Sequence, residues 1–378
     1  MGHSFTNYNP VKVFFESERE INLAPFVATN AKTWVIASET ILDKWPQLYK
    51  SLPANAKLMT DVSVNPDINI IDEIEKPPSV TQVIGIGGGS VLDTAKALFA
   101  KILTKGQYTL NEIIDTPQVL DETFGITRNK NKLILVPTTF GTSSEITKWA
   151  TIWDWQKKKK YSLSHDALYA DSAVIIPALS LSLSRYFTAS TGLDVLSHAL
   201  ESVWNKENNY LTRLNAIESI RICAEYLPKL LNQLDSIEYR TEMAKASLLA
   251  GMAFSQTKTA AAHSLSYPLT LFHDIPHGYA CSLTLGSMFE YNYSVHKTGL
   301  SQVLEIFQKH YGSEDTPFKD CFDHFLTDCS VPKKLSEFGV KDTDVSQLVS
   351  HSFHPERFNN MVGQLTAQQV KDIYHDIL

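Results

Sequence analysis

Three short segments in the second half of the chain carry side chains that suit a divalent cation. Asp194 and His198 lie four residues apart in an apolar stretch, so a helix would place both on one face, one turn apart. His263 lies among small apolar residues, and His277 follows Asp274, which we expect to cap a helix at its N-terminus. A single histidine of this kind is usually a satisfied core residue. One carboxylate and three imidazoles together predict a metal site for Fe(II), Zn(II) or Ni(II).

A glycine-rich turn in the first half suits a phosphate group. Residues 82–86 form an apolar run, residues 91–102 have a helical pattern, and the turn between them comprises Gly87, Gly88, Gly89 and Ser90. Glycines at a strand-to-helix turn let backbone N–H groups approach a phosphate, and the helix N-terminus adds a partial positive charge. A tight turn without a ligand is the alternative interpretation. The run also differs from the G-x-G-x-x-G dinucleotide motif.

A second loop, residues 137–145, follows the next predicted strand and contains five hydroxyl side chains and a glycine. Ligands of parallel sheets bind at the carboxyl ends of the strands, so hydroxyls there suit ribose and pyrophosphate. By itself the loop is more typical of an ordinary polar connection with helix-capping residues. Its place beside the glycine turn favours the nucleotide interpretation.

The elements that must position these residues change character along the chain. Apolar runs at 33–38, 82–86 and 132–136 alternate with helical patterns near 41–52 and 91–102, which indicates a parallel sheet covered on both faces. After residue 178 the periodicity is helical, with clear stretches at 187–204, 210–234, 239–256, 297–310, 315–329 and 366–377. We therefore expect an α/β dinucleotide-binding domain over residues 1–178 and a helical metal-binding domain over 179–378. A cleft between two such domains is a common place for a ligand.

The composition limits the class of protein. The 378 residues are 43% hydrophobic and 20% charged, with a formal charge of -7, so a nucleic-acid or anionic-membrane partner is not expected. No basic-then-apolar leader and no long apolar window are found, and the four cysteines form no C-x-x-C pair. These features suit a protein of the reducing cytoplasm without a thiolate zinc cage.

The motifs together resemble the iron-containing (group III) alcohol dehydrogenases, which share their fold with glycerol dehydrogenases and dehydroquinate synthases. The matching segments, in family order, are Gly85–Lys96, Pro137–Thr147, Gly192–Glu201 and Gly251–Gly278. The resemblance implies a Rossmann-like N-terminal domain with a parallel sheet, an all-helical C-terminal domain and an active site between them. It also implies a divalent metal, iron(II) first and zinc as the alternative, with NADH or NADPH as cofactor.

The resemblance assigns roles to particular positions. Asp194, His198, His263 and His277 would hold the metal. The nucleotide would be contacted by residues of both loops and by one lysine, namely Gly87, Gly88, Gly89, Ser90, Asp93, Thr138, Thr139, Thr142 and Lys160.

Two positions depart from the pattern of many family members. Tyr267 stands where many carry a histidine that is a candidate proton relay, so Tyr267 itself and the nearby His273 become the candidates for that role. Ser38 stands where many carry an aspartate that selects NAD by bonding the ribose 2′-hydroxyl, and Glu39 follows it. Without a carboxylate at position 38 we expect NADPH to be used, although Glu39 leaves the choice between the cofactors open.

Two further segments resemble a narrower branch, the phosphonoacetaldehyde reductases: Lys148–Asp154 with Lys160–Leu163, and Ser255–Thr270. In that branch Tyr267 would be the ordinary residue. A phosphonate needs cationic partners, and Lys258 and Lys148 are the candidates. Lys258 is also predicted to be a catalytic residue. The alternative interpretation is that both are ordinary surface lysines.

The expected activity is metal-dependent hydride transfer between a nicotinamide and a small aldehyde or alcohol, with phosphonoacetaldehyde and 2-hydroxyethylphosphonate as the specific pair. A general short-chain alcohol or diol dehydrogenase is an alternative within the same class. A dehydroquinate-synthase-like lyase and a non-catalytic nucleotide-binding protein are alternatives of other classes. The resemblance further implies a homodimer.

Overall fold

The chain is built from two units in the computed structural model, which describes residues 4–17, 21–75, 79–121 and 128–378. Unit 1 comprises Met1–Tyr8, Phe140–Thr142 and Leu183–Leu378, and unit 2 comprises Asn9–Thr139 and Ser143–Ser182. The chain therefore enters unit 1 for three residues in the middle of unit 2 before it returns.

Unit 2 contains a sheet of six strands, in which every pair is parallel and the order is β1-β8-β5-β4-β2-β3. The strands are β1 (Lys12–Phe15), β2 (Thr33–Ala37), β3 (Lys57–Met59), β4 (Gln82–Gly87), β5 (Lys132–Pro137) and β8 (Ser172–Ile175). Every residue of β2 and β4 is buried, as expected for apolar strands covered on both faces. Gly87 pairs with Pro137, so the carboxyl ends of β4 and β5 lie side by side.

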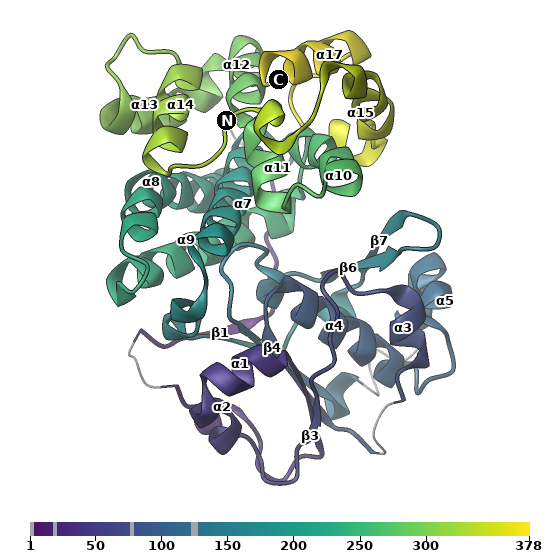
Figure 1. The fold of residues 1–378 in the computed structure, drawn as a ribbon. Helices are drawn as coiled ribbons and strands as arrows, with labels where there is room; N and C mark the ends of the chain where they lie inside the picture. Colours follow the sequence, from purple (N-terminus) through teal and green to yellow (C-terminus); the bar gives the residue numbers. More distant parts are fainter. Residues whose placement is uncertain (1–3, 18–20, 76–78, 122–127) are drawn as a thin grey trace. The chain divides into compact units, whose positions relative to one another are not determined.

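The helices of unit 2 follow the strands, and the long α4 packs against β2, β4 and β5 (Figure 1). The helix expected over 41–52 is two helices that meet at Trp45, because Pro46 cannot continue the first. An antiparallel hairpin also lies within this unit. These elements are α1 (Glu39–Lys44), α2 (Pro46–Ser51), α3 (Ile68–Glu73), α4 (Gly89–Leu103), α5 (Leu110–Asp115), β6 (Trp149–Asp154) and β7 (Lys159–Ser164), with short 3-10 turns at 24–26, 117–120, 128–130, 144–146, 166–168 and 177–182.

Unit 1 is helical throughout its described residues, which contain no strand. Helices α7, α8 and α9 pack against one another, and α11 packs on α7 (Figure 1). The helices are α7 (Arg185–Val203), α8 (Tyr210–Asn232), α9 (Ile237–Thr257), α10 (Ala261–His273), α11 (His277–Leu283), α12 (Leu285–Val295), α13 (Lys297–Tyr311), α14 (Phe318–Asp328), α15 (Val345–Ser352), α16 (Pro355–Phe358) and α17 (Ala367–Asp376), with 3-10 turns at 335–338 and 342–344.

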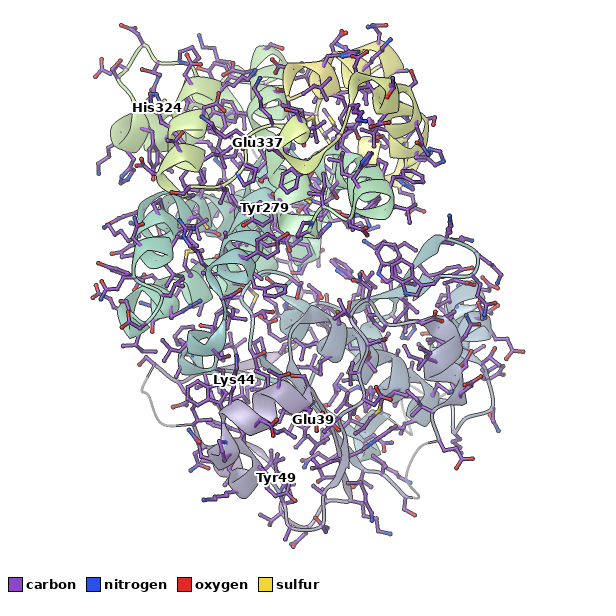
Figure 2. The ribbon with its side chains drawn as sticks, viewed as in Figure 1. Glu39, Lys44, Tyr49, Tyr279, His324 and Glu337 are labelled. Carbon is purple, nitrogen blue, oxygen red and sulfur yellow. The ribbon has the colours of Figure 1, made fainter. Side chains whose placement is uncertain are left out.

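A glycine lets α11 approach α7 at backbone distance. A Cβ added at Gly278 would lie 1.8 Å from the carbonyl oxygen of Ser190, so no larger residue fits there without moving one helix. Tyr279, the next residue of α11 (Figure 2), hydrogen-bonds through its hydroxyl to the carbonyl oxygen of Tyr186 at 3.4 Å. Two of the three helices that carry the candidate metal ligands, α7 and α11, are thus held together at two neighbouring points.

The predicted fold class, a parallel α/β part followed by a helical part, is confirmed. One local prediction is wrong: Asp274 does not cap the N-terminus of a helix. It ends α10 with φ 53°, and Pro276 precedes α11, because two short helices meet there with only three residues between them. Within the described residues, no helix has the length and apolarity needed to cross a membrane.

Candidate active site

Four donor atoms from three helices of unit 1 converge. They come from Asp194 on α7, His263 on α10, and His277 with Cys281 on α11, and all four lie within 4.8 Å of one another. Oδ1 of Asp194 lies 3.6 Å from Nε2 of His263 and 3.7 Å from Nε2 of His277. Asp194 and His198 lie four residues apart on α7, and His277 and Cys281 lie four residues apart on α11. This spacing places the two members of each pair on the same helix face.

Donor atoms in this group and on the neighbouring His198 are buried and lack a hydrogen-bond partner among the described residues. Oδ1 of Asp194, Nε2 of His263 and Nδ1 of His198 are buried and have no hydrogen-bond partner among the described residues. A buried polar atom left unsatisfied costs free energy. Because the distances between these acceptors are too long for hydrogen bonds, a cation at their centre would satisfy them together. The residues present therefore fit a divalent metal.

Glu201 fixes the orientation of His263. This fully buried carboxylate lies one turn beyond His198 on α7 and accepts three hydrogen bonds. The donors are the backbone N–H of Ala260 (2.7 Å), the backbone N–H of His263 (3.2 Å) and Nδ1 of His263 (2.7 Å). With its proton held on Nδ1, His263 presents a bare Nε2, which is the usual arrangement of a metal-ligating imidazole.

The electrostatics of the site favour a positive charge at its centre. Burial raises the pKa of Asp194, but His198, His277 and His263 outweigh it and hold that pKa below its usual range. Burial lowers the pKa of His263, but Cys281, Glu201 and Asp194 outweigh it and raise that pKa. The site therefore attracts a proton when no other cation occupies it.

His198 lies beside this cluster. Its Nδ1 is 3.9 Å from Oδ1 of Asp194, and its ring stacks between Phe254 (4.1 Å) and His263 (4.6 Å). Burial lowers the pKa of His198 to about 4, against the attraction of Asp194, so the ring is neutral at neutral pH. His198 is not among the four donors that lie within 4.8 Å of one another.

The structure thus brings together Asp194, His263 and His277 as the sequence predicted, with His198 adjacent. Sequence reasoning missed Cys281 and Glu201, although each had a detectable signal. Cys281 lies four residues after His277, and Glu201 lies seven after Asp194, so helical spacing places each on the face of a predicted ligand.

The three residues predicted to be catalytic are placed differently. The ring of Tyr267 lies parallel to that of His277, with 6.4 Å between centroids. His273 is the last residue of α10, about 15 Å along the helix axis from His263. Lys258 ends α9 with its side chain exposed and φ 63°. Of the three, the structure places only Tyr267 beside the cluster.

In unit 2 the glycine turn forms a cradle at the carboxyl ends of β4 and β5. Gly88 precedes α4, and a Cβ at Gly88 would lie 3.2 Å from the hydroxyl oxygen of Thr139. A Cβ at Gly87 would lie 2.6 Å from the side chain of Val91. The N–H of Thr138 donates to the carbonyl oxygen of Gly87 at 2.9 Å. The two predicted loops therefore touch, and the helix N-terminus lies between them, where an anion is favoured.

Other predicted nucleotide contacts have protein partners of their own. The carboxylate of Asp93 accepts from the hydroxyl of Ser144 (2.7 Å) and the N–H of Thr151 (2.8 Å), so it ties α4 to the second loop and to β6. The hydroxyl of Ser90 accepts from the N–H of Asn65 at 3.1 Å.

The remaining predicted contacts are spread over both units. Ser38 is half-buried at the end of β2, and the ammonium of Lys160 on β7 lies 5.8 Å from the ring of Trp153. Thr142 belongs to unit 1.

Comparison with known proteins agrees with this architecture. The iron-containing alcohol dehydrogenase model matches residues 10–177, and the C-terminal model of the Fe-containing alcohol dehydrogenase family matches residues 188–378. A 1-propanol dehydrogenase of Citrobacter freundii is 34% identical over 272 residues, which are 70% of this chain and 68% of the relative. A phosphonoacetaldehyde reductase of Streptomyces viridochromogenes is 31% identical over 212 residues, 56% of this chain and 53% of the relative.

A solved structure of sulfoacetaldehyde reductase from Bifidobacterium kashiwanohense, in complex with NAD+, has a TM-score of 0.86 at 26% identity and covers 100% of this chain and 99% of its own. The similarity to this solved structure extends over both units, and the two family models together also match residues of both units. The fold, the segments in family order and these matches show that the chain belongs to the iron-containing alcohol dehydrogenase family and is an oxidoreductase that acts on CH–OH groups.

Proposed function

We propose that unit 1 binds one divalent metal, that unit 2 binds NADH or NADPH, and that the enzyme reduces a small aldehyde bearing an anionic group. The observation that carries the proposal is the convergence of unpartnered, buried lone pairs on Asp194 and His263 with the imidazole of His277. Iron(II) and zinc(II) both suit carboxylate and imidazole ligands.

The loop after β5 contributes residues to both units. Thr139 lies against Gly88 of the glycine turn, whereas a Cβ added at Gly141 would lie 3.1 Å from Cα of Thr191 on α7. Only one residue separates Thr139 from Gly141. The loop therefore contacts the glycine turn within unit 2 at Thr139 and helix α7 within unit 1 at Gly141.

Each bound group supplies one part of the chemistry. Asp194, His263 and His277 would hold a divalent cation, which would serve as a Lewis acid toward the carbonyl oxygen of the substrate, and a bound nicotinamide would supply the hydride.

The residues of the chain orient these groups and keep the site dry. Glu201 holds His263 in its ligating orientation, and Phe254 covers His198. Asp194 and His263 have side chains 6% and 4% exposed, whereas that of His277 is 37% exposed. Substrate would therefore approach on the His277 side, where Tyr267 can donate a proton to the substrate oxygen through its hydroxyl.

An arginine near Tyr267 supports an anionic substrate. The guanidinium of Arg357 lies 5.2 Å from the centre of the Tyr267 ring, and His354 lies against the same ring at 5.2 Å. The earlier candidates are less suited, since Lys148 pairs with Asp166 at 2.7 Å and Lys258 is exposed. Guanidinium binds phosphonate and sulfonate oxygens in pairs, and the named substrates of two relatives are aldehydes with such groups.

The test is a panel of aldehydes assayed with both reduced cofactors and added Fe(II) or Zn(II). The panel contains phosphonoacetaldehyde, sulfoacetaldehyde and propionaldehyde. We expect metal-dependent oxidation of NADPH by at least one anionic aldehyde, and loss of turnover in His263→Ala with the fold retained by circular dichroism. Wild-type activity in metal-stripped His263→Ala would overturn the metal proposal, and a NADH preference above a hundredfold would overturn the use of NADPH that Ser38 predicts.

Arg357→Gln tests the anionic group separately. We expect KM for phosphonoacetaldehyde to rise at least tenfold while KM for propionaldehyde stays within twofold. Only phosphonoacetaldehyde has an anionic group that the guanidinium of Arg357 can bind. An equal change for both substrates would show that Arg357 acts by holding Tyr267 rather than by binding substrate.

A further inference from the structure

We propose that Lys96 is a positioning residue for the nucleotide: its buried ammonium ties the far end of the loop after β5 to α4, the helix that begins at the glycine turn. The inference rests on the binding of NADH or NADPH by unit 2 in the proposed function. It adds a residue that acts through the loop and not by contact with the cofactor. The hydrogen-bonded groups involved all belong to unit 2.

Lys96 places its ammonium at the point where the loop passes into β6. The residue lies in the middle of α4 and is fully buried. Its Nζ donates to the carbonyl oxygen of Thr147 (2.8 Å), to the hydroxyl oxygen of Thr147 (3.3 Å) and to the carbonyl oxygen of Trp149 (2.8 Å). An ammonium has three N–H donors, so one short segment of chain uses all of them.

Asp93 holds the same segment from the same side of α4. Asp93 and Lys96 are three residues apart, so they are neighbours on one face of the helix. The carboxylate of Asp93 accepts from the hydroxyl of Ser144 (2.7 Å) and from the N–H of Thr151 (2.8 Å). One face of α4 therefore fixes the segment 144–151 near both of its ends and in its middle.

The packing of the core does not by itself account for a charged group at position 96. Burial lowers the pKa of Lys96 to about 8, although Asp93 and Glu145 act to raise it. Among the described residues its hydrogen-bond partners are neutral oxygens, and it makes no ion pair. An apolar side chain of similar volume would avoid the cost of burying the charge. What the ammonium adds is a set of directed bonds to the loop.

The other end of this loop is fixed at the glycine turn. The N–H of Thr138 donates to the carbonyl oxygen of Gly87 at 2.9 Å, and a Cβ added at Gly88 would lie 3.2 Å from the hydroxyl oxygen of Thr139. Ordering a chain segment costs conformational entropy, so a loop that is already fixed at both ends binds a ligand more tightly. Release of the Lys96 end should therefore weaken nucleotide binding.

The test is the binding of NADPH and NADH to the full chain without substrate, followed by the fluorescence of the reduced nicotinamide. We expect Lys96→Met to raise Kd at least tenfold, because methionine has a similar length but no donor. Lys101→Met is the matched control on α4. Lys101 also donates to two backbone carbonyl oxygens, those of Ile71 (3.1 Å) and Asp72 (2.8 Å), but these belong to α3. This variant should keep Kd within twofold of the wild type.

The double variant Lys96→Met/Glu145→Gln separates positioning from stability. In Lys96→Met the buried carboxylate of Glu145 loses a nearby cation, which destabilises the fold, and the neutral amide removes that cost. We expect the double variant to unfold in urea at a midpoint close to that of the wild type, yet to bind the nucleotide at least tenfold more weakly. If Lys96 serves stability alone, the double variant will bind as the wild type does.

Hydrogen exchange of the wild type gives a readout that needs no variant. We expect the amides of residues 147–151 to be protected before any nucleotide is added. Rapid exchange there, or a double variant that binds within twofold of the wild type, would show that Lys96 is not a positioning residue although the nucleotide site stands. If the wild type binds neither NADPH nor NADH, the nucleotide site of the proposed function fails as well.

Discussion

Glu201 shows how a residue that does not face the cation can control the metal site. Its carboxylate accepts hydrogen bonds from Nδ1–H of His263 and from two backbone N–H groups. Burial raises the pKa of Glu201, but His263 and the backbone donors lower it further, so the group is ionised at neutral pH. Replacing it by a neutral amide would remove the charge that makes His263 a strong ligand.

For Glu201→Gln we therefore expect the affinity for Zn(II) to fall about 10- to 100-fold, with the secondary structure retained. The measurement is competition with a chromophoric chelator. Glu238→Gln, at an exposed position of α9, is the matched control and should leave the affinity unchanged. An affinity for zinc within twofold of the wild type would show that Glu201 supports only the fold.

Glu145 gives a prediction about pH. Burial raises its pKa from an ordinary 4.5 to about 7, so the folded chain keeps a proton there that the unfolded chain has already lost. The stability that this proton brings is complete below pH 4.5 and disappears as pH rises to about 7. Above pH 7 the folded state holds a buried carboxylate, whose cost the neutral amide of Glu145→Gln avoids.

We expect Glu145→Gln to have a higher free energy of unfolding than the wild type at pH 8, by up to about 3 kcal/mol, and a similar one at pH 4.5. Urea unfolding followed by tryptophan fluorescence measures it, since five of the six tryptophans lie in unit 2. Glu39→Gln, at an exposed side chain of α1 (Figure 2), should show no such pH dependence. Equal effects of Glu145→Gln at both pH values would contradict the argument.

At the level of single residues, the sequence could predict the kinds of side chain in the metal site but not which of them converge. The spacing of Asp194 and His198 predicts one helix face, but the third and fourth donors depend on how α10 and α11 pack. The place of Cys281 beside these donors is a matter of packing geometry, which no local sequence pattern reveals.

Among the elements, α11 matters most because it carries two of the four converging donors and begins at one of them. Gly278 lets its backbone rest on Ser190 of α7. The distance between these helices sets the distance from Asp194 to His277, so a change in their packing would change the metal site directly.

We expect Gly278→Ala to lower the thermal midpoint and to weaken Zn(II) binding more than tenfold, because a Cβ 1.8 Å from a carbonyl oxygen must push the helices apart. Thermal unfolding with and without zinc checks both effects. Gly286→Ala is the control on α12, where the added Cβ would meet the flexible side chain of Lys319 at 3.3 Å. If Gly278→Ala binds zinc as the wild type does, the contact between α7 and α11 does not determine the site.

The long helices were predictable because each carries many apolar repeats. The stretches 187–204, 210–234 and 239–256 agree with α7, α8 and α9 to within about two residues. Short elements were harder to predict: β1, β3 and β8 contain only four, three and four residues, too few to show a period. The β6–β7 hairpin was missed as well, because its six-residue strands mix lysines and serines with apolar residues. The helix expected over 41–52 divides at Pro46. This break was predictable, because a proline inside a helical stretch ends or kinks the helix.

For the whole molecule, the proposed ligands should protect different units. Metal binding should slow hydrogen exchange in α7, α10 and α11, and NADPH should slow it at the β4–α4 turn. Residues 137–145 should respond to both, because Phe140–Thr142 belong to unit 1 and the residues on either side of them belong to unit 2. Hydrogen-exchange mass spectrometry of the protein with each ligand and with both measures this. Protection of the 137–145 loop by only one ligand would contradict this expectation.

The division of the chain also has a consequence for its synthesis. Ser182 is the last residue of unit 2, whereas the proposed metal ligands begin at Asp194 and end at His277. On a ribosome the nucleotide module can fold while the residues of unit 1 that hold the cation are still inside the exit tunnel or untranslated. A nascent chain arrested shortly after unit 2 has emerged should therefore capture nucleotide but no zinc.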